Sequence, residues 1–377
     1  MAKKIKILFT GGGTGGHLFP LLAVIREIKR LGDNQQMVLH YIGPKDEKSQ
    51  FLLAQENVKI HNIISGKIRR YFSLENITDI LFSIPFGFLQ SFFILLFNRP
   101  ALVFSKGGSG SVPVTVCANI LRIPVFMHES DTIPGQSNRV TSAFAKKIFT
   151  SFENTEYFNR DKTILTGNPI LKEVMEGNIE SAKEIFNLKT QKPVLLFWGG
   201  SQGAEPINDF VLTILEQLLQ SYQVIHVCGK KNYHSVQQEA NVILHNLQVL
   251  KEDYHPWEFL DETPLKHALK VADLIISRAG SGSIFEISAC GKPSILIPLP
   301  SSANNHQSKN AYEYAKNGSA VIIEQDNLSP NFFLQKVHYL LSNANGLEQM
   351  KQSALSFAKP LASKAIAREI LEYLHIN

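Results

Sequence analysis

The feature that most constrains the fold is a pattern that occurs twice along the chain: an apolar run, a glycine-rich stretch, and apolar residues at helical spacing. The first copy spans residues 5–31 and the second spans residues 193–218. Each apolar run has the length of a buried strand, and the positions after the glycines recur as on one face of a helix. Strand, glycine loop and helix together begin a parallel sheet, so the sequence predicts two similar α/β domains.

The remaining chain alternates short apolar runs with helical stretches, as in doubly wound sheets with helices on both faces. Its 377 residues are enough for two separate cores. The turn-forming triplet Gly167-Asn168-Pro169 sets the first boundary. We expect domains at 1–166 and 167–350, and a helical segment at 351–377 that packs back on the N-terminal domain. Further strands are predicted over residues 37–42, 101–105, 124–128, 147–151, 224–228, 274–277, 294–298 and 320–323.

Charge is distributed unevenly between the halves. Residues 1–165 carry 20 Lys and Arg against 12 Asp and Glu, whereas residues 166–377 carry 18 against 21. A basic half suits nucleic acid, an anionic membrane or a phosphorylated substrate. The basic start of the chain reaches glycines after only a few apolar residues, which predicts a first strand and not a signal peptide. The cysteines, which lack zinc spacing, predict free thiols in a reducing cytosol: Cys117, Cys228 and Cys290.

An uncharged segment at residues 80–97 contains six phenylalanines. Its length is marginal for a membrane-spanning helix, and Pro85 and Gly87 lie inside it. A buried crossover helix and a helix whose outer face enters a membrane are the other interpretations. Cations with neighbouring aromatic residues precede the segment and favour the membrane-surface interpretation, although a solvated basic loop is the alternative. These expected membrane contacts are Lys67, Arg69, Arg70, Tyr71 and Phe72.

The first glycine stretch matches Gly11-x-Gly13-x-x-Gly16, the dinucleotide fingerprint, so an oxidoreductase has to be considered. A nicotinamide site needs an acidic residue at the end of the second strand, where Tyr41-Ile42-Gly43-Pro44 stands instead. His17 occupies the place of the lysine of a P-loop. The loop amides are therefore expected to face another anionic or oxygen-rich ligand. His17 is a candidate general base, with a buried capping histidine as the alternative.

Three stretches in the second half also suit an anionic, hydroxyl-rich ligand. Gly199–Gly203 predicts amides around a diphosphate, with a plain tight turn as the alternative. The stretch 278–286 predicts another anion-binding helix start, in which Glu286 faces vicinal hydroxyls or pairs with Ser283 in a capping box. The polar cluster 304–311 suits sugar hydroxyls, although a loop explains each residue alone.

Together these motifs resemble the MurG family of glycosyltransferases (glycosyltransferase family 28) in order and spacing over nearly the whole chain. The resemblance implies a GT-B fold of two Rossmann-like domains facing a deep cleft. It also implies inverting transfer of GlcNAc from UDP-GlcNAc to the C4 hydroxyl of MurNAc in lipid I, giving lipid II for the cell wall. No cofactor or bound metal is implied. The matching motifs are Gly12–His17 with Pro20, His128-Glu129, Gly167–Pro169, Gly199–Ala204, Arg278–Glu286 and His306–Ala311.

The resemblance also implies roles for single residues. His17 is the candidate base, Ser201 lies at the diphosphate, Glu286 at the ribose and Gln307 at the GlcNAc. Expected acceptor contacts are Gly13, Gly107, Gly108 and Glu129. Expected donor contacts are Thr14, Gly15, Gly16, Asn138, Ser201, Gln202, Gly203, Ser281, Gly282, Ser283, Ile284, Phe285, Glu286 and Gln307.

The implied partners are UDP-GlcNAc, lipid I, an anionic membrane surface at the cytoplasmic face of a bacterial inner membrane, and cell-wall synthesis proteins; nucleic acid is not expected. The chain departs from the family pattern at three positions, where Leu171 replaces Arg, Asp131 replaces Asn and Ser109 replaces an aromatic residue. Other enzyme classes remain open, namely another GT-B transferase for a lipid or small-molecule acceptor and a UDP-GlcNAc epimerase. A nucleotide-sugar-binding regulator is the non-enzymatic alternative.

Overall fold

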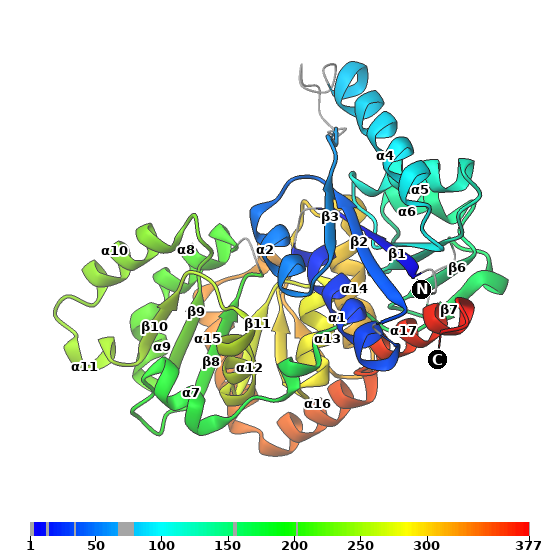
Figure 1. Ribbon diagram of the computed structural model, residues 1–377. Helices are drawn as coiled ribbons and strands as arrows, with labels where there is room; N and C mark the ends of the chain where they lie inside the picture. The colour runs from blue at the N-terminus through cyan, green and yellow to red at the C-terminus, as the bar shows by residue number, and fades with distance from the viewer. Residues whose placement is uncertain are drawn as a thin grey trace. The chain divides into compact units, whose positions relative to one another are not determined.

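The two glycine-loop patterns lie in two separate parallel sheets of the computed structural model (Figure 1). The structure describes residues 4–12, 15–33, 35–66, 79–153, 157–200 and 203–376. Two units divide the chain: residues 1–171 with 360–377, and residues 172–359. All observed strand pairs are parallel, so the predicted α/β class is confirmed.

The first unit is built on a seven-stranded sheet of order β3-β2-β1-β4-β5-β6-β7. The direction of strand addition reverses between β1 and β4, and open α/β sheets bind ligands at the carboxyl ends of the strands beside such a reversal. The strands are β1 Ile5–Thr10, β2 Met37–Gly43, β3 Lys59–Asn62, β4 Leu102–Ser105, β5 Val125–Glu129, β6 Lys147–Thr150 and β7 Thr163–Leu165.

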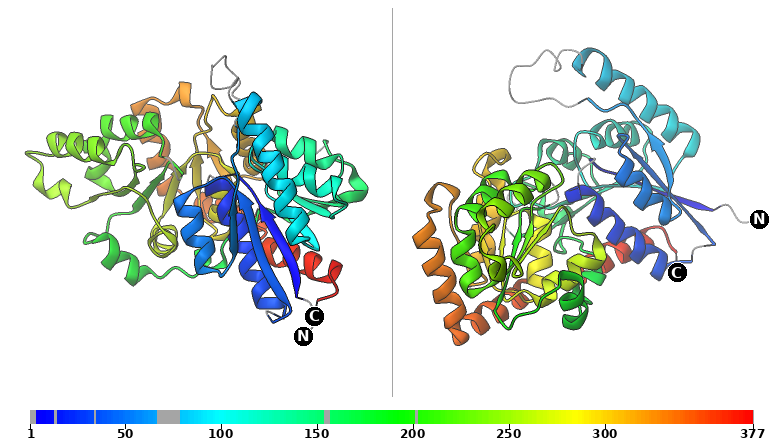
Figure 2. Two further views of the ribbon diagram at one scale, coloured as in Figure 1. Left: turned by 45° about the horizontal axis from the view of Figure 1, so that its top comes forward. Right: turned by 90° about the vertical axis from the view of Figure 1, so that its left-hand side faces the viewer.

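Helices cover both faces of this sheet (Figure 2). The C-terminal helix α17 lies beside α1, and Tyr373 of α17 packs its ring 5.1 Å from that of Phe126. Lys147 of β6 forms an ion pair with Glu369. The last helix thus belongs to the core of the first unit. The helical elements are α1 Gly15–Leu31, α2 Glu47–Gln55, η1 Asp79–Ser83, α4 Ile84–Asn98, α5 Ser111–Ile120, α6 Gln136–Ser142, η2 Arg160–Lys162 and α17 Ala362–Tyr373.

The second unit repeats the plan with a six-stranded sheet of order β10-β9-β8-β11-β12-β13. Its reversal lies between β8 and β11, whose carboxyl ends carry two of the predicted anion-binding stretches. A buried hydrophobic cluster joins β8, β9 and β11 to the helices on one face. The strands are β8 Val194–Trp198, β9 Gln223–Val227, β10 Tyr254–Trp257, β11 Leu274–Ser277, β12 Ser294–Leu296 and β13 Ala320–Ile322.

The helical elements of the second unit fill both faces of its sheet, and its last helix, α16, ends at Phe357. The ring of Phe357 packs 5.2 Å from Phe285 and 4.9 Å from Tyr314. The elements are η3 Lys172–Met175, α7 Ile179–Phe186, α8 Glu205–Thr213, α9 Leu215–Ser221, α10 Tyr233–Ile243, α11 Gln248–Lys251, α12 Glu262–Val271, α13 Ser281–Ala289, η4 Ala303–Asn305, α14 His306–Ala315, η5 Gln325–Asn327, α15 Pro330–Ser342 and α16 Ala344–Phe357.

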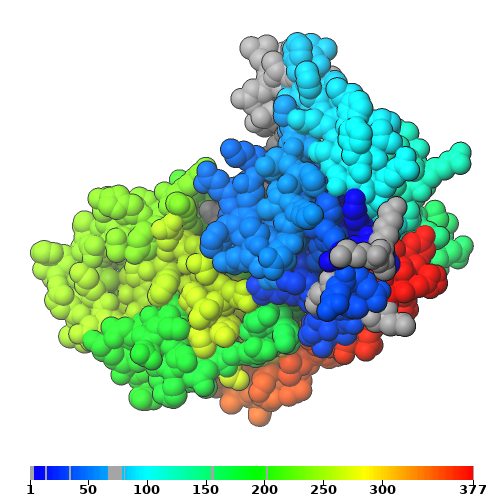
Figure 3. All heavy atoms as spheres, viewed as in Figure 1, coloured from blue at the N-terminus to red at the C-terminus, as the bar shows by residue number. Residues whose placement is uncertain are grey.

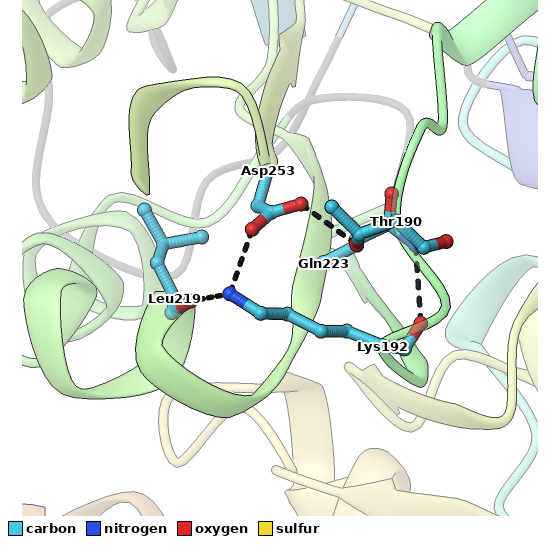
Figure 4. Close-up of polar contacts among 5 residues, drawn as sticks. All are labelled: Thr190, Lys192, Leu219, Gln223 and Asp253. Atoms are coloured by element: carbon cyan, nitrogen blue, oxygen red, sulfur yellow. Dashed lines mark hydrogen bonds and ion pairs between the residues drawn. The ribbon is translucent and has the colours of Figure 1, made fainter. Parts of the chain in front are cut away.

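Polar contacts tie together the amino ends of β8, β9 and β10 (Figure 4). Asp253, before β10, pairs with Lys192, before β8, at 2.8 Å and accepts a hydrogen bond from Thr190 at 2.9 Å. Lys192 also donates to the carbonyl of Leu219, and Gln223 donates to the carbonyl of Lys192. These polar groups are used for stability at the sheet edge opposite the candidate site.

The phenylalanine-rich segment forms α4, preceded by the π-helical turn η1. Gly87, Ser91 and Leu95 face the core, and a Cβ on Gly87 would stand 2.4 Å from the Ile64 carbonyl oxygen. Pro85 lies in the first turn, where proline needs no hydrogen-bond donor and does not break a helix. One described helical stretch, Leu81–Asn98, is long and apolar enough to cross a membrane by length and composition.

Candidate functional site

In the first unit, the two glycine stretches pack backbone against backbone at the carboxyl ends of β1 and β4. The amide of Gly12 donates to the carbonyl of Gly107 at 2.8 Å. Gly108 has φ +92°, and a Cβ there would stand 2.7 Å from Gly12 Cα. Only glycine fits at such a position. The Tyr41 hydroxyl donates to the Gly11 carbonyl at 3.2 Å and so holds the loop from β2.

His17 stands in the first turn of α1, directly above this glycine pair. A Cβ on Gly12 would lie 3.1 Å from His17 Nδ1, and one on Gly108 would lie 3.5 Å from Nε2. Burial and then the charge of Lys106 lower the pKa of His17 to about 4, while Asp131 acts in the opposite direction. The imidazole is therefore neutral at neutral pH and able to accept a proton.

The carboxyl end of β5 places Glu129 and Asn138 beside the same loop. Glu129 is buried, and its carboxylate accepts from the amides of Asp131 at 3.0 Å and Gly135 at 3.2 Å. Asn138 donates to Glu129 at 2.8 Å and to the His128 carbonyl at 3.1 Å. Both side chains thus hold the loop of residues 129–138, and their predicted substrate contacts stay predictions.

Asn138 also keeps one oxygen without a partner among the described residues. Its Oδ1 is buried and lies 2.7 Å from the position of a Cβ on Gly107, where φ is +86°. The residue predicted to contact the donor and the glycine predicted to contact the acceptor are therefore neighbours in the first unit.

Burial raises the pKa of Glu129 to about 7, and Asp131 contributes in the same direction. The hydrogen bonds from Asn138 and from the Asp131 amide, together with the charge of Lys106, oppose this shift. Since the carboxylate accepts hydrogen bonds from Asp131, Gly135 and Asn138, its ionised form supports the observed loop conformation.

In the second unit, the glycine loop after β8 packs closely against the carboxyl end of β9. Gly203 has φ +77°, and a Cβ there would stand 2.2 Å from the Cys228 carbonyl oxygen. Asn208 of α8 donates to the same oxygen at 2.9 Å, and His226 contacts Asn208 Oδ1 at 3.0 Å. Gly200 has φ +83°, and no described atom lies within 4 Å of a Cβ built there. The backbone around Gly200 can therefore approach a ligand closely.

The N-terminus of α13 begins at the carboxyl end of the adjacent strand β11. No described atom lies within 4 Å of a Cβ built on Gly280 or Gly282. Ser281 Oγ is buried without a hydrogen-bond partner among the described residues. A helix N-terminus, a Ser281 hydroxyl with no partner among the described residues and open space beside the glycines suit an anion.

Glu286 lies deeper along α13, and no cation of the described residues acts on its pKa. Burial raises its pKa to about 8, so the carboxyl group is largely protonated at neutral pH. The helix cap is Gly280, which makes no side-chain cap bond, so Ser283 is not an N-cap and a Ser283–Glu286 capping box is excluded. Ile284 and Phe285 have buried side chains, so a donor contact there would use their backbone.

Gln307 lies at the start of α14, after β12. Its Oε1 accepts from the Leu299 amide at 3.0 Å, and its Nε2 makes no hydrogen bond within the described chain. Asn304 and Asn305 adopt left-handed conformations that turn the chain into α14. Arg278, by contrast, is structural, since its guanidinium donates to the carbonyls of Ile297 and Pro298 and to Gln325.

Several predicted contacts lie outside the described residues. Gly15 and Gly16 begin α1, and no described atom lies within 4 Å of a Cβ built on Gly16. The described part of the chain contains no group of three or more His, Cys, Asp or Glu side chains that could hold a metal ion. The contacts outside the described ranges are Gly13, Thr14, Ser201, Gln202, Lys67, Arg69, Arg70, Tyr71 and Phe72.

Sequence reasoning missed Lys106, the residue before the Gly107-Gly108 pair. Its side chain is buried, and its ammonium contacts Ser130 Oγ beyond β5. No signal in the sequence indicated this burial, because lysine side chains are usually exposed.

The acidic residue of a nicotinamide site is absent from the end of β2. Tyr41 uses its hydroxyl on the glycine loop, and Asp46 caps α2 by accepting from the Ser49 amide at 2.8 Å. The dinucleotide interpretation of the first glycine motif is thus not supported.

Comparisons with known proteins agree with these two units. Residues 7–150 match the glycosyltransferase family 28 N-terminal domain and residues 194–366 match its C-terminal domain. The UDP-N-acetylglucosamine–N-acetylmuramyl-(pentapeptide) pyrophosphoryl-undecaprenol N-acetylglucosamine transferase of Clostridium tetani is 39% identical over 93% of this chain and 94% of its own. The protein of the same name from Clostridium kluyveri is 38% identical over 94% of this chain and 96% of its own.

Solved structures show the same architecture. MurG of Acinetobacter baumannii superposes with a TM-score of 0.72 and 25% identity, covering 98% of this chain and 99% of that one. The UDP-GlcNAc 2-epimerase of Neisseria meningitidis, bound to UDP-GlcNAc, has a TM-score of 0.71 at 15% identity, with 98% and 100% covered. The predicted GT-B fold is confirmed, while the second likeness concerns the fold alone.

Proposed function

We propose a function on the premise that the chain belongs to glycosyltransferase family 28, among the MurG N-acetylglucosaminyltransferases. It transfers GlcNAc from UDP-GlcNAc to the C4 hydroxyl of MurNAc in lipid I, and the product is lipid II for peptidoglycan synthesis. The observation that carries this conclusion is the 39% identity that extends over 93% of the chain, through both units.

The donor is bound by the second unit. The open backbone at Gly200, Gly280 and Gly282, the free Ser281 hydroxyl and the N-terminus of α13 support a diphosphate site. Glu286 supports recognition of the ribose, because a carboxyl group can contact two vicinal hydroxyls. Gln307 keeps its Nε2 donor for an oxygen of the sugar.

The acceptor is bound by the first unit, where the Gly12 and Gly107-Gly108 backbones approach each other under His17. Neutral His17 removes the proton from the acceptor hydroxyl as this oxygen attacks the anomeric carbon. The bond to the UDP oxygen breaks, and the loop amides and the α13 dipole stabilise the charge that develops on the diphosphate. Attack opposite the leaving group inverts the anomeric centre.

The protein acts as a membrane-associated cytoplasmic enzyme, as its family does, and binds the inner membrane peripherally. The support comes from η1 and α4, which lie at the surface of the first unit (Figure 3). Large apolar side chains on their outward face are exposed. Such a face suits the headgroup boundary of a bilayer. Its members, called the outer face of α4 below, are Leu81, Phe82, Phe86, Leu89, Phe93 and Phe97.

A single assay tests the proposed function. The protein is mixed with labelled UDP-GlcNAc and a short-chain lipid I analogue, with and without EDTA, and a parallel sample omits the acceptor. We expect label to enter the lipid in both chelator conditions, and no conversion of the donor without acceptor. Epimerised UDP-sugar in the sample without acceptor, or label that stays in the donor, would contradict the proposal.

A further inference from the structure

Lys106 is a buried cation that the proposed chemistry does not yet use. It follows β4, its amide donates to the Thr10 carbonyl at 2.9 Å, and only 2% of the residue is exposed. Within the described chain, the ammonium makes one hydrogen bond, to Ser130 Oγ. Ser130 in turn donates to Asn168 at 3.3 Å. Burying an ammonium with so few partners is costly, and such groups cluster at functional sites.

The side chains of Lys106 and His17 both start next to Gly11. A Cβ built on Gly11 would stand 3.6 Å from Lys106 Cβ and equally 3.6 Å from His17 Cβ. Among the described residues, Lys106, from the end of β4, and Asp131, from beyond β5, act on the imidazole through their charges. Lys106 and burial lower the pKa of His17, and Asp131 raises it. Glu129 and Asp131 support the charged form of Lys106, whose pKa burial lowers to about 8.

The negative charge of the proposed substrates gives the lowered pKa of His17 a purpose. The donor and the acceptor each bring a diphosphate, and negative charge near an imidazole favours its protonated form. A histidine with an ordinary pKa would be protonated beside such charge and could not act as a base. The low starting value, about 4, leaves room for the substrates to raise the pKa of His17 toward the working pH without protonating it.

We propose that Lys106 is a positioning residue for His17, a built-in countercharge that keeps the imidazole uncharged while the diphosphate substrates gather around it. This inference rests on the proposed function, in which His17 is the base. The role requires the charge of Lys106 and not merely its volume.

The test combines pH profiles of kcat and kcat/KM for wild type, Lys106→Met, Lys106→Arg and Asp131→Asn. Without the cation, the acid limb, along which activity falls as His17 becomes protonated, should move up by about 1 to 3 pH units, with activity retained at high pH. Lys106→Arg should keep the wild-type midpoint. Asp131→Asn in the Lys106→Met background should move the limb back down. An equal loss at every pH with an unchanged midpoint would overturn the inference.

A second readout does not depend on turnover. The ring-nitrogen NMR signals of His17, assigned by their absence in His17→Ala, are titrated in the unliganded protein. We expect Lys106→Met, and Lys106→Gln if the methionine variant does not fold, to raise the titration midpoint of His17. An unchanged midpoint refutes the role of Lys106, whereas a wild-type protein that does not transfer GlcNAc refutes the proposed function instead.

Discussion

At the scale of single residues, burial holds two titratable groups of the candidate site, His17 and Glu286, in their neutral forms. His17 has its pKa lowered to about 4 and Glu286 has its pKa raised to about 8. Opposite shifts have one cause, since burial disfavours the charged form of any group. A ligand that pairs with the charged form of Glu286 must therefore displace a proton at neutral pH.

This displacement predicts a pH dependence of UDP affinity. Ribose hydroxyls that donate to Glu286 favour its carboxylate, so binding lowers its pKa and releases a proton below about pH 8. UDP should bind more tightly as the pH rises from 6 to 9. Dividing the affinity of the wild type by that of Glu286→Gln cancels the effect of the ionisation of UDP itself. We expect this affinity ratio to rise by about 10- to 100-fold, as for a charge-assisted hydrogen bond.

Isothermal titration calorimetry of both proteins in buffers of different ionisation enthalpy measures affinity and proton release together. A ratio of dissociation constants that stays constant across this pH range would show that Glu286 does not contact the ribose.

The sequence was informative about these residues to different degrees. His17 and Glu286 stand at marked positions, directly after a glycine loop and one turn into a helix, so local pattern predicted their placement. Glu129 and Asn138 are 9 residues apart, and their mutual hydrogen bond depends on a loop that no local pattern describes. Lys106 was missed because its burial results from the packing of β1, β4 and β5 around it.

At the scale of elements, the central strands and the edge strand β13 were predictable, whereas the edge strands β3, β7 and β10 were not. The predicted central strands are long apolar runs, because both faces of a parallel sheet are covered. The unpredicted strands β3, β7 and β10 are edge or short strands with half-exposed residues, such as Lys59–Asn62, and their pairing depends on the neighbouring strand. The polar residues Lys59, His61 and Asn62 leave β3 without an apolar run.

Glycine loops at the strand ends predict a matched pair of stability changes. Gly203→Ala and Gly200→Ala both place a side chain at positive φ, which costs about 1 to 2 kcal/mol. Only at Gly203 does the new Cβ meet a carbonyl, that of Cys228 at 2.2 Å. We expect Gly203→Ala to be less stable than Gly200→Ala by about 1 to 3 kcal/mol, which is the usual cost of overpacking. Denaturant unfolding measures the free energy of unfolding of both variants. Equal losses of stability would mean that the backbone of this loop and the Cys228 carbonyl move apart at little cost.

At the scale of the whole molecule, each unit carries its own part of the proposed reaction. The proposed base and the proposed acceptor loops lie in the first unit, and the proposed donor site lies in the second. The first unit also carries the outer face of α4, so the proposed lipid acceptor and the membrane contact belong to the same unit. This division agrees with the excess of basic residues in the first half of the chain.

If the outer face of α4 binds the membrane, substitutions in this face should weaken vesicle binding, whereas substitutions on the surface of the second unit should not. Phe93 and Phe97 are 45% and 78% exposed, and replacing both with Ser removes an apolar contribution of about 1.5 to 3 kcal/mol for each ring that enters the bilayer. Sedimentation with anionic vesicles at high salt, which screens basic residues but not apolar contacts, should fall many-fold.

The matched control replaces two exposed aromatic residues of α15, Phe332 at 45% and Tyr339 at 59%. Binding by this control should equal that of wild type. An equal loss of vesicle binding in both variants would show that α4 is not the membrane contact. Resistance of the wild-type protein to both salt and carbonate extraction would mean that residues 81–98 span the bilayer.

The measurement that tests the central claim most directly is the rate of lipid II formation by His17→Ala beside wild type, with the donor dissociation constant measured on the same preparations. We predict a kcat lower by about 100- to 10,000-fold, the usual contribution of a general base, with nearly unchanged UDP-GlcNAc affinity. Unchanged turnover by His17→Ala, or a loss of donor affinity that accounts for the whole defect, would contradict the account.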